Sequence, residues 1–215
     1  MAREFANTAG SPNIDYIVYS GVPPVSGLGT VSIVMRCAGD SDTVNFGTML
    51  SVVNAGVTNA VAIGRNATGA NLYHAYRNGT TGIRTFPFTF DGTMRSVIST
   101  FDGSASPKDV AYVDGVSQTI SGTAFASTTI GTPTVCEISG TTGVRFNGRL
   151  AEVAIYNRVI TQAEATMHAA GMSCLKFPRG LIFYAPLIRE VHDIAGGLTG
   201  TITGTTVSDH PRIYA

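Results

Sequence analysis

The sequence contains little charge and no tryptophan. Charged residues make up 13% of the 215 residues, about half of what soluble proteins usually carry. The 14 basic residues balance the 14 acidic ones, so no net field draws the protein onto nucleic acid or an anionic membrane, and we expect neither partner. Low charge also indicates that part of the surface is covered by other protein, which predicts an assembly.

Cysteines are few, and their spacing is uninformative. Cys37, Cys136 and Cys174 are odd in number and form no CxxC pair. They therefore predict neither a zinc site nor a closed set of internal disulfides. Two interpretations remain open: three buried thiols, or a disulfide between subunits that forms once a particle reaches an oxidising medium.

Long apolar runs are absent. No stretch is long and apolar enough to span a bilayer, and the start, MAREFANTAGS, lacks the basic and apolar segments of a secretory signal. We therefore expect a protein that is made and kept in a cytoplasm until something releases it.

Motifs for catalysis and for metal binding are also missing. The histidines form no HxH or HExxH pair and no GxSxG occurs, while the five glutamates place no two carboxylates on one strand face, as glycoside hydrolysis requires. We expect no enzymatic activity and no cofactor, and we interpret each histidine as a surface or interface residue. The histidines are His74, His168, His192 and His210.

Residues that favour strands and turns are abundant. The 25 glycines and the many Thr, Ser and Val residues suit short strands, and regular spacing of strand candidates indicates a sandwich or barrel. Asp114-Gly115 and Asn78-Gly79 accept the positive φ of a tight hairpin turn. The candidates are residues 30–38, 48–55, 60–65, 70–79, 95–101, 109–115, 134–139 and 148–157.

One helix is predicted, near residues 161–170. In ITQAEATMHAAG, Thr161 and Glu164 form a capping box and Gly171 supplies the stop. No repeat of fixed period and no low-complexity linker occurs. A boundary is possible at residues 171–178, where the helix ends and a tail begins.

Three stretches together resemble the laminin-G-like, concanavalin A-like sandwich family. They are FANTAGSPNIDYIVYSG with the following TVSIVMR, then RSVISTFDGSASPKDVAYVDGVSQT, and FNGRLAEVAIYNRVITQAEA. The resemblance covers roughly residues 3–170, and it departs from the family where Val34 occupies a position that is usually aromatic. It implies an all-β, two-sheet antiparallel jelly-roll sandwich for residues 1–170.

The remaining segment, residues 171–215, contains GLIFYAPLIREVHDIAGGLTGTITGTT, which resembles the segment that normally comes first in this family. The ends of a compact domain often lie close together, so strands in permuted order could complete the same sandwich. Alternatively the segment inserts into a neighbouring subunit.

The resemblance also suggests roles for particular residues. Glu152 occupies an acidic position of the closing strand, which we interpret as structural. The GDSD run, residues 39–42, is a loop that could offer oxygens to calcium, as in some relatives, although a solvated turn is the simpler interpretation. Sugar binding in this fold uses an exposed aromatic platform. The chain has no tryptophan, and packing explains Tyr73, Tyr76 and Tyr112 at least as well.

The closing segment, FPRGLIFYAPLI through TVSDHPRIYA, resembles tails of bacteriophage structural proteins that carry laminin-G-like domains. We therefore expect a non-enzymatic virion protein: a capsid decoration protein on the outer capsid surface that bridges and stabilises capsid subunits. Its expected partners are the major capsid protein and copies of itself, as a homo-oligomer such as a trimer. The alternative is a carbohydrate-binding module of a phage tail fibre or collar, with a glycan as ligand.

Overall fold

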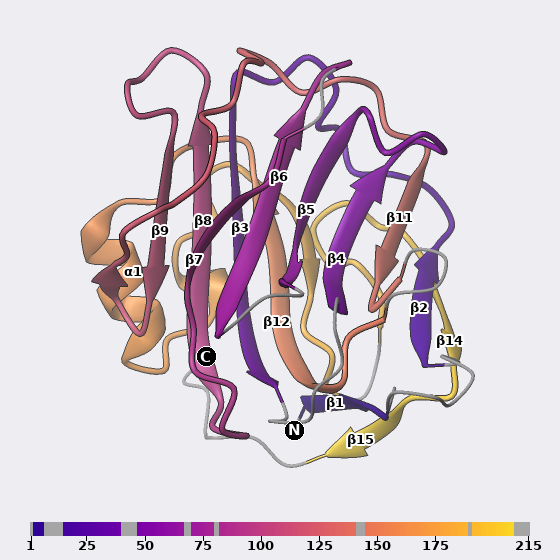
Figure 1. Cartoon of the computed structure of the whole chain (residues 1–215). Helices are drawn as coiled ribbons and strands as arrows, with labels where there is room; N and C mark the ends of the chain where they lie inside the picture. The colour runs from indigo at the N-terminus through magenta and orange to yellow at the C-terminus, as the bar shows by residue number, and fades with distance from the viewer. Residues whose placement is uncertain are drawn as a thin grey trace.

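A computed structural model describes residues 2–6, 15–39, 47–66, 70–79, 82–140, 145–188 and 191–208. Within them, two antiparallel sheets pack face to face and one helix lies outside one sheet (Figure 1). The predicted all-β, two-sheet antiparallel sandwich is therefore confirmed.

The eight-stranded sheet has the order β10-β9-β8-β3-β12-β1-β15, and β13 also pairs with β12. Its strands are β1 (Ala2–Phe5), β3 (Thr30–Gly39), β8 (Arg95–Asp102), β9 (Asp109–Val113), β10 (Val116–Ser117), β12 (Gly148–Tyr156), β13 (Leu181–Ala185) and β15 (Thr206–Ser208).

The seven-stranded sheet has the order β14-β2-β11-β4-β5-β6-β7. Its strands are β2 (Tyr16–Tyr19), β4 (Gly47–Val53), β5 (Ala60–Arg65), β6 (Asn71–Arg77), β7 (Arg84–Pro87), β11 (Val135–Ile138) and β14 (Gly200–Thr203).

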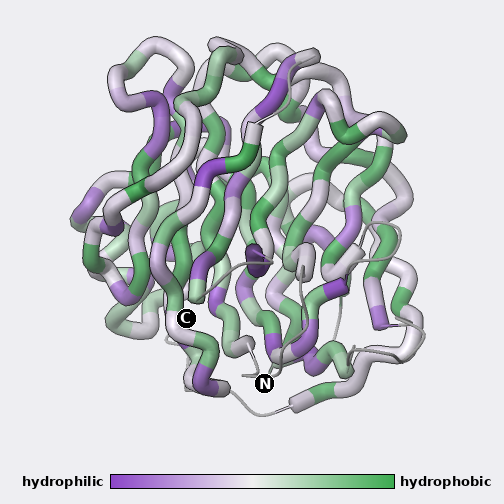
Figure 2. The backbone as a smooth tube through the Cα atoms, viewed as in Figure 1, coloured by the Kyte–Doolittle hydropathy of each residue, from purple (hydrophilic) through white to green (hydrophobic). Residues whose placement is uncertain are grey.

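The main core lies between the sheets and follows from the alternation of side chains along each strand. On β6, Leu72 and Tyr76 point inward and join the core cluster, whereas Tyr73 points outward. Hydrophobic residues concentrate in the central strands of both sheets, and the turns are paler or hydrophilic (Figure 2). Burying one Leu or Ile side chain contributes about 1.5–3 kcal/mol, so these strands hold the sheets together.

β3 is buried on both faces because a second core covers its outer side. Ile33 and Met35 face the main core, whereas Val34 packs in a smaller cluster with Tyr156 and Phe177. That smaller cluster lies beneath α1 (Gln162–Ala169) and the 3-10 turn η1 (Cys174–Lys176). Coverage on both sides explains why every residue from Val31 to Gly39 is buried, including the polar Ser32 and Arg36.

The helix begins and ends as predicted. The side chain of Thr161 accepts a hydrogen bond from the backbone of Glu164, and the Glu164 carboxylate accepts one from the Thr161 backbone. Gly171, with φ of 99°, follows the helix. Because these signals are local, the sequence sufficed to place both ends.

The two predicted hairpin turns have different outcomes. Asp114 and Gly115 have φ values of 49° and 75° and join β9 to β10 in a tight turn, as predicted. The prediction for Asn78-Gly79 is confirmed only in part: Gly79 has the expected positive φ, 67°, but no two-residue turn joins β6 to β7. β6 ends at Arg77, β7 begins only at Arg84, and the register pairs Arg84 with His74. The connection is therefore longer than a two-residue turn.

The C-terminal segment contributes strands to both sheets of its own chain. β13 pairs with β12, β14 with β2, and β15 with β1. In Figure 1 the yellow strands β14 and β15 lie beside the indigo strands β2 and β1. The permuted origin of this arrangement, and insertion into a neighbouring subunit, stay predictions.

The three cysteines lie inside the fold. Cys37, Cys136 and Cys174 are free thiols with no exposed surface, and burial raises the pKa of each above its ordinary value. This placement agrees with the interpretation as buried thiols. A disulfide between subunits would require one of them to leave the core.

No helix among the described residues is long and apolar enough to cross a membrane.

Candidate functional site

The expectation that the histidines lie at the surface is wrong for two of them. His74 and His168 are fully buried, while His192 is exposed and His210 lies outside the described residues. Each buried histidine is held by polar partners from several strands, and these contacts compensate for its removal from water.

His74 links the two sheets. Its Nδ1 lies 2.5 Å from Ser99 Oγ on β8, and its Nε2 lies 3.0 Å from Asp109 Oδ2 on β9. Asp109 also pairs with Arg84 at 2.5 Å, and the Tyr76 hydroxyl donates to the Ser99 carbonyl. Burial lowers the pKa of His74, so the ring is neutral at pH 7.

The order Ser99, His74, Asp109 is that of a hydrolase triad, but access is missing. Ser99 and His74 have no exposed surface and Asp109 is 3% exposed. A triad is recognised by its roles as well as its geometry, and no substrate carbonyl reaches a hydroxyl enclosed between two sheets. This cluster is a polar cross-link within the core.

Glu152 anchors a second buried cluster beneath α1. It accepts hydrogen bonds from the Tyr184 hydroxyl at 2.9 Å and from Arg36 Nε at 3.1 Å. His168 Nε2 lies 3.6 Å away, and its Nδ1 contacts Ser96 Oγ at 2.7 Å. Burial alone would raise the pKa of Glu152, but His168 and the neighbouring hydroxyl groups lower it to about 2.

The backbone at Glu152 is unusual. Its φ is 51°, where the pairing of β12 shifts register. Before this point β12 pairs with β1, and after it with β13. A positive φ is costly for glutamate, and the buried contacts hold it in place. The structural role expected for Glu152 agrees with this geometry.

The described residues contain no group of three or more His, Cys, Asp or Glu side chains able to hold a metal ion. Of the candidate calcium loop, residues 40–42 lie outside the described part of the chain.

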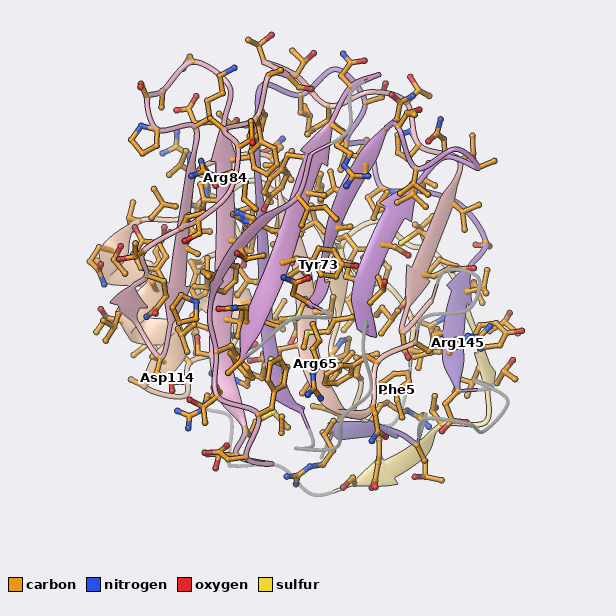
Figure 3. The ribbon with its side chains drawn as sticks, viewed as in Figure 1. Phe5, Arg65, Tyr73, Arg84, Asp114 and Arg145 are labelled. Carbon is orange, nitrogen blue, oxygen red and sulfur yellow. The ribbon has the colours of Figure 1, made fainter. Side chains whose placement is uncertain are left out.

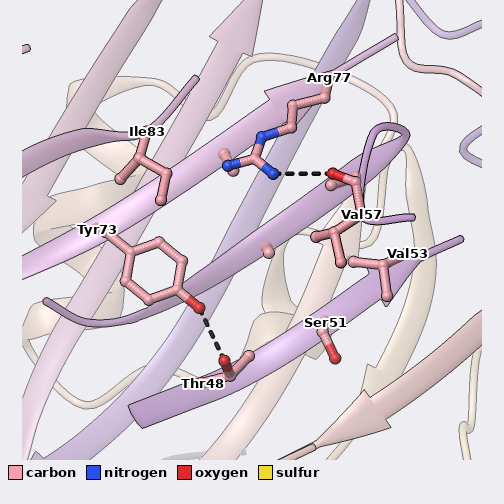
Figure 4. A pocket seen from close by; sticks show the side chains of 10 residues that line it. Thr48, Ser51, Val53, Val57, Tyr73, Arg77 and Ile83 are labelled. Carbon is pink, nitrogen blue, oxygen red and sulfur yellow. Dashed lines mark hydrogen bonds between the residues drawn. The ribbon is translucent and has the colours of Figure 1, made fainter. Parts of the chain in front are cut away.

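The tyrosines that we interpreted as packing residues take three different positions. Tyr76 is in the main core and Tyr112 is in the cluster beneath α1. Tyr73 faces outward from the seven-stranded sheet, and Figure 3 shows it in front of β5 and β6. There it borders a hollow of about 170 Å³ on the outer face of β4, β5 and β6 (Figure 4).

Small residues on β5 make the floor of this hollow. Three rows of paired residues cross the sheet, and in each the middle residue, on β5, is alanine or glycine. The rows are Val53–Ala60–Arg77, Ser51–Ala62–Ala75 and Thr48–Gly64–Tyr73. The central row has no large side chain, which leaves the recess.

Tyr73 forms one end wall. Its ring crosses β5 above Gly64, and its hydroxyl lies 2.9 Å from Thr48 Oγ on β4. A Cβ on Gly64 would lie 2.8 Å from the Tyr73 ring, so only glycine permits this position. The position of the Tyr73 ring as an end wall therefore depends on the glycine at residue 64.

Arg77 forms the opposite end. Its Nε donates to the Gly82 carbonyl at 2.9 Å and its Nη1 to the Val57 carbonyl at 2.8 Å. Figure 4 shows the guanidinium lying between Val57 and Ile83, with its remaining nitrogen turned toward the Ile83 and Tyr73 side. Tyr73 and Arg77 are both on β6, and together they frame the central row.

One polar group on the floor has no partner. Ser51 Oγ is buried, the residue being only 1% exposed, and it forms no hydrogen bond with any described residue. Burying an unsatisfied hydroxyl costs about 1–3 kcal/mol. Ser51 lines the hollow, so a ligand could supply the missing hydrogen bond.

The described lining of the hollow contains no carboxylate, histidine or cysteine, so none of these side chains could act there as a general acid, a general base or a thiol nucleophile. Sequence analysis missed this site because Ser51, Ala62 and Arg77 come together only through strand register.

Comparison with known proteins gives the fold. No protein-family model matches the chain, and no curated protein is significantly similar in sequence. A Bacteroides ovatus protein provisionally described as carbohydrate binding has a TM-score of 0.70 at 17% identity, over 98% of this chain and 60% of its own. The present chain thus spans less than two thirds of that protein. The fold is laminin-G-like and concanavalin A-like.

Two further structures agree with this fold. A heptameric SAP-like pentraxin from Limulus polyphemus has a TM-score of 0.66 at 13% identity, over 94% of both chains. Domains LG4-5 of the mouse laminin α1 chain have a TM-score of 0.54 at 10% identity, over 75% of this chain and 43% of theirs. The family resemblance is therefore confirmed as a fold, while the bacteriophage association stays a prediction.

Proposed function

We propose that this chain is a non-catalytic carbohydrate-binding domain whose site is the hollow on the outer face of β4, β5 and β6. The observation that carries the proposal is the buried Ser51 hydroxyl, which lacks a partner at the floor of that hollow. The similar fold of the Bacteroides ovatus protein supports it by analogy only.

The lining suits one sugar ring. A sugar has apolar C–H faces and hydroxyl groups at its edge, and binding sites combine apolar walls with a few placed polar groups. Here Ala62 and Ala75 give an apolar floor, the Tyr73 ring gives a wall, and Ser51 offers a hydroxyl. The volume of about 170 Å³ is below the roughly 300–1,000 Å³ of sites for drug-sized ligands.

Filling the hollow tests the site. The wild-type protein is screened on a glycan array, and hits are measured by calorimetry. Ala62→Leu puts a larger side chain on the floor, and we expect it to abolish binding because the ring no longer fits. The matched control, Ala195→Leu, changes an exposed turn residue and should bind normally. Unchanged binding by Ala62→Leu would place the site elsewhere, and no array hit would contradict the proposal.

The second candidate function is the capsid decoration expected from the sequence. Besides the low charge, two exposed apolar residues favour a protein partner: Ile202 on β14 is 41% exposed and Val207 on β15 is 47% exposed, each on the end strand of its sheet. No further described strand pairs with β14 or β15 on its outer side, and the edge of an end strand is suited to pairing with another chain.

Cryo-electron microscopy of a particle that contains this chain separates the two functions. A decoration protein would give density at repeated positions over an icosahedral shell. Density confined to the neck, tail tip or fibres would instead favour glycan binding at a receptor.

A further inference from the structure

Arg77 is a buried arginine that forms no ion pair with any described residue. Four arginines pair with carboxylates, and these pairs are Arg36–Glu152, Arg84–Asp109, Arg95–Asp91 with Asp114, and Arg158–Glu164. Arg77 is only 8% exposed, yet its partners are the neutral carbonyls of Val57 and Gly82. A charge withdrawn from water is normally paired with an opposite charge, but no carboxylate among the described residues pairs with this guanidinium.

The Nη2 group of Arg77 faces the hollow. Nε and Nη1 are occupied, and no hydrogen bond leaves Nη2 among the described residues. Arg77 lines the hollow, and Figure 4 shows the free end of its guanidinium on the same side as Tyr73 and Ile83. Burial lowers the pKa of Arg77 from its ordinary value of 12.5, but a guanidinium stays charged in proteins.

The hollow thus has two polar side chains with hydrogen-bonding capacity left for a ligand, Ser51 and Arg77, separated by an apolar floor. Ser51 lies on β4 and Arg77 on β6, two strands away, or about 9.5 Å across the sheet. Ala62 and Ala75 fill the central row between them. One contact is neutral and can donate or accept, whereas the other donates from a positive group. A matching ligand carries a hydroxyl toward Ser51 and an anionic oxygen toward Arg77.

We propose that the hollow selects a carboxylate-bearing sugar, with the carboxylate on Arg77 and a ring hydroxyl on Ser51. This inference rests on the proposed carbohydrate-binding function and adds the chemical class of the ligand. The carboxylate would be a counter-ion for the Arg77 guanidinium, which has none among the described residues. A charge-assisted hydrogen bond of this kind is stronger than one between neutral groups.

The test compares sugars that differ only in the acid. Binding is measured by calorimetry for methyl glycosides of glucuronic, galacturonic and mannuronic acid and for the neutral glucose, galactose and mannose counterparts. For at least one pair we expect the acid to bind about ten- to a hundredfold more tightly, the range for a hydrogen bond to a charged group. Arg77→Gln should bring that ratio close to one. Raising the salt concentration should reduce it in the wild type.

Two variants guard against a folding defect. Arg77→Lys keeps the positive charge and should retain part of the preference. Arg95→Gln removes a half-buried arginine of the other sheet that pairs with Asp91 and Asp114, and its ratio should equal that of the wild type.

The outcomes separate this inference from the proposed function. If neutral sugars bind as tightly as their acids and Ala62→Leu abolishes that binding, the hollow is a sugar site but the acid preference is overturned. If the acid preference survives in Arg77→Gln, the assignment to Arg77 is overturned. If no sugar of either kind binds, in these pairs or on the array, both fail together.

Discussion

The outer faces of the two sheets both carry a buried arginine and a buried serine, but these side chains differ in whether the described protein supplies their polar partners. Beneath α1, on the eight-stranded sheet, Arg36 pairs with Glu152 and Ser96 contacts His168. On the seven-stranded sheet, Arg77 pairs with no carboxylate and Ser51 forms no side-chain hydrogen bond within the part of the chain that the structure describes. One arginine and one serine are therefore satisfied within the protein on the first face, but not on the second. The first face is structural, and the second is suited to a ligand.

The largest loss of stability should come from removing the Glu152 charge, which pairs with Arg36 on the outer face of the eight-stranded sheet. Glu152→Gln preserves the shape of the side chain but removes the charge that holds Arg36, and the loss of one partner of a buried pair costs about 3–5 kcal/mol. Urea denaturation should show this loss in the free energy of unfolding. Glu4→Gln, which changes an exposed glutamate on β1, is the control. A loss below 1 kcal/mol for Glu152→Gln would contradict the assigned role.

Acid should destabilise the fold through the two buried histidines. Burial lowers the pKa of His74 and of His168 from 6.5, so below pH 6.5 the unfolded chain binds protons that the folded chain does not. Stability is therefore complete above pH 6.5 and falls as the pH decreases, by up to about 1.4 kcal/mol per pH unit for each histidine. Glu152, with a pKa of about 2 against 4.5, adds a further loss between pH 4.5 and 2.

Urea midpoints measured at pH 7.5, 6.5 and 5.5 check this. His74→Gln lowers stability at pH 7.5, but it should also reduce the slope below pH 6.5, because one titrating group is gone. A midpoint that is constant from pH 7.5 to 5.5 would show that neither ring resists protonation. The groups facing His74 are Ser99, Asp109, Arg84 and Tyr76, and those facing His168 are Glu152, Arg36 and Ser96.

The smallest effect should have the opposite sign. Ser51→Ala removes a buried hydroxyl that makes no hydrogen bond, so we expect it to raise the free energy of unfolding by about 1 kcal/mol while weakening sugar binding. Ser99→Ala is the matched variant, and it should destabilise because His74 and Tyr76 lose a partner. Thermal unfolding measures the change in stability of each variant relative to the wild type. Equal destabilisation would remove the contrast between the two faces.

Features fixed by neighbouring residues could be predicted from the sequence. β5 spans Ala60–Arg65 as expected, and the capping box of Thr161 and Glu164 places the helix start. The hairpin at Asp114-Gly115 was equally readable. Short strands such as β1 and β7, by contrast, carry too few residues for a pattern and depend on long-range pairing.

The candidate site could not be predicted in the same way. Ser51, Ala62 and Ala75 share a row only because of the registers of β4, β5 and β6, which local sequence does not fix. One signal for His74 was available: in LYHAYR it alternates with Leu72 and Tyr76, both of which face the core. The prediction that His74 lies at the surface followed the polarity of the imidazole ring and not this alternation, and it was wrong.

The placement of β14 and β15 has a consequence for synthesis on the ribosome. Gly200 pairs with Tyr19 and Ser208 with Ala2, so two native pairings join residues from nearly opposite ends of the printed sequence. β1 and β2 leave the ribosome early but receive these partners only after almost all of these residues have been translated. Such distant pairing slows folding. Until it forms, the early strands have exposed edges, so the nascent chain should depend on chaperones or low concentration to avoid aggregation.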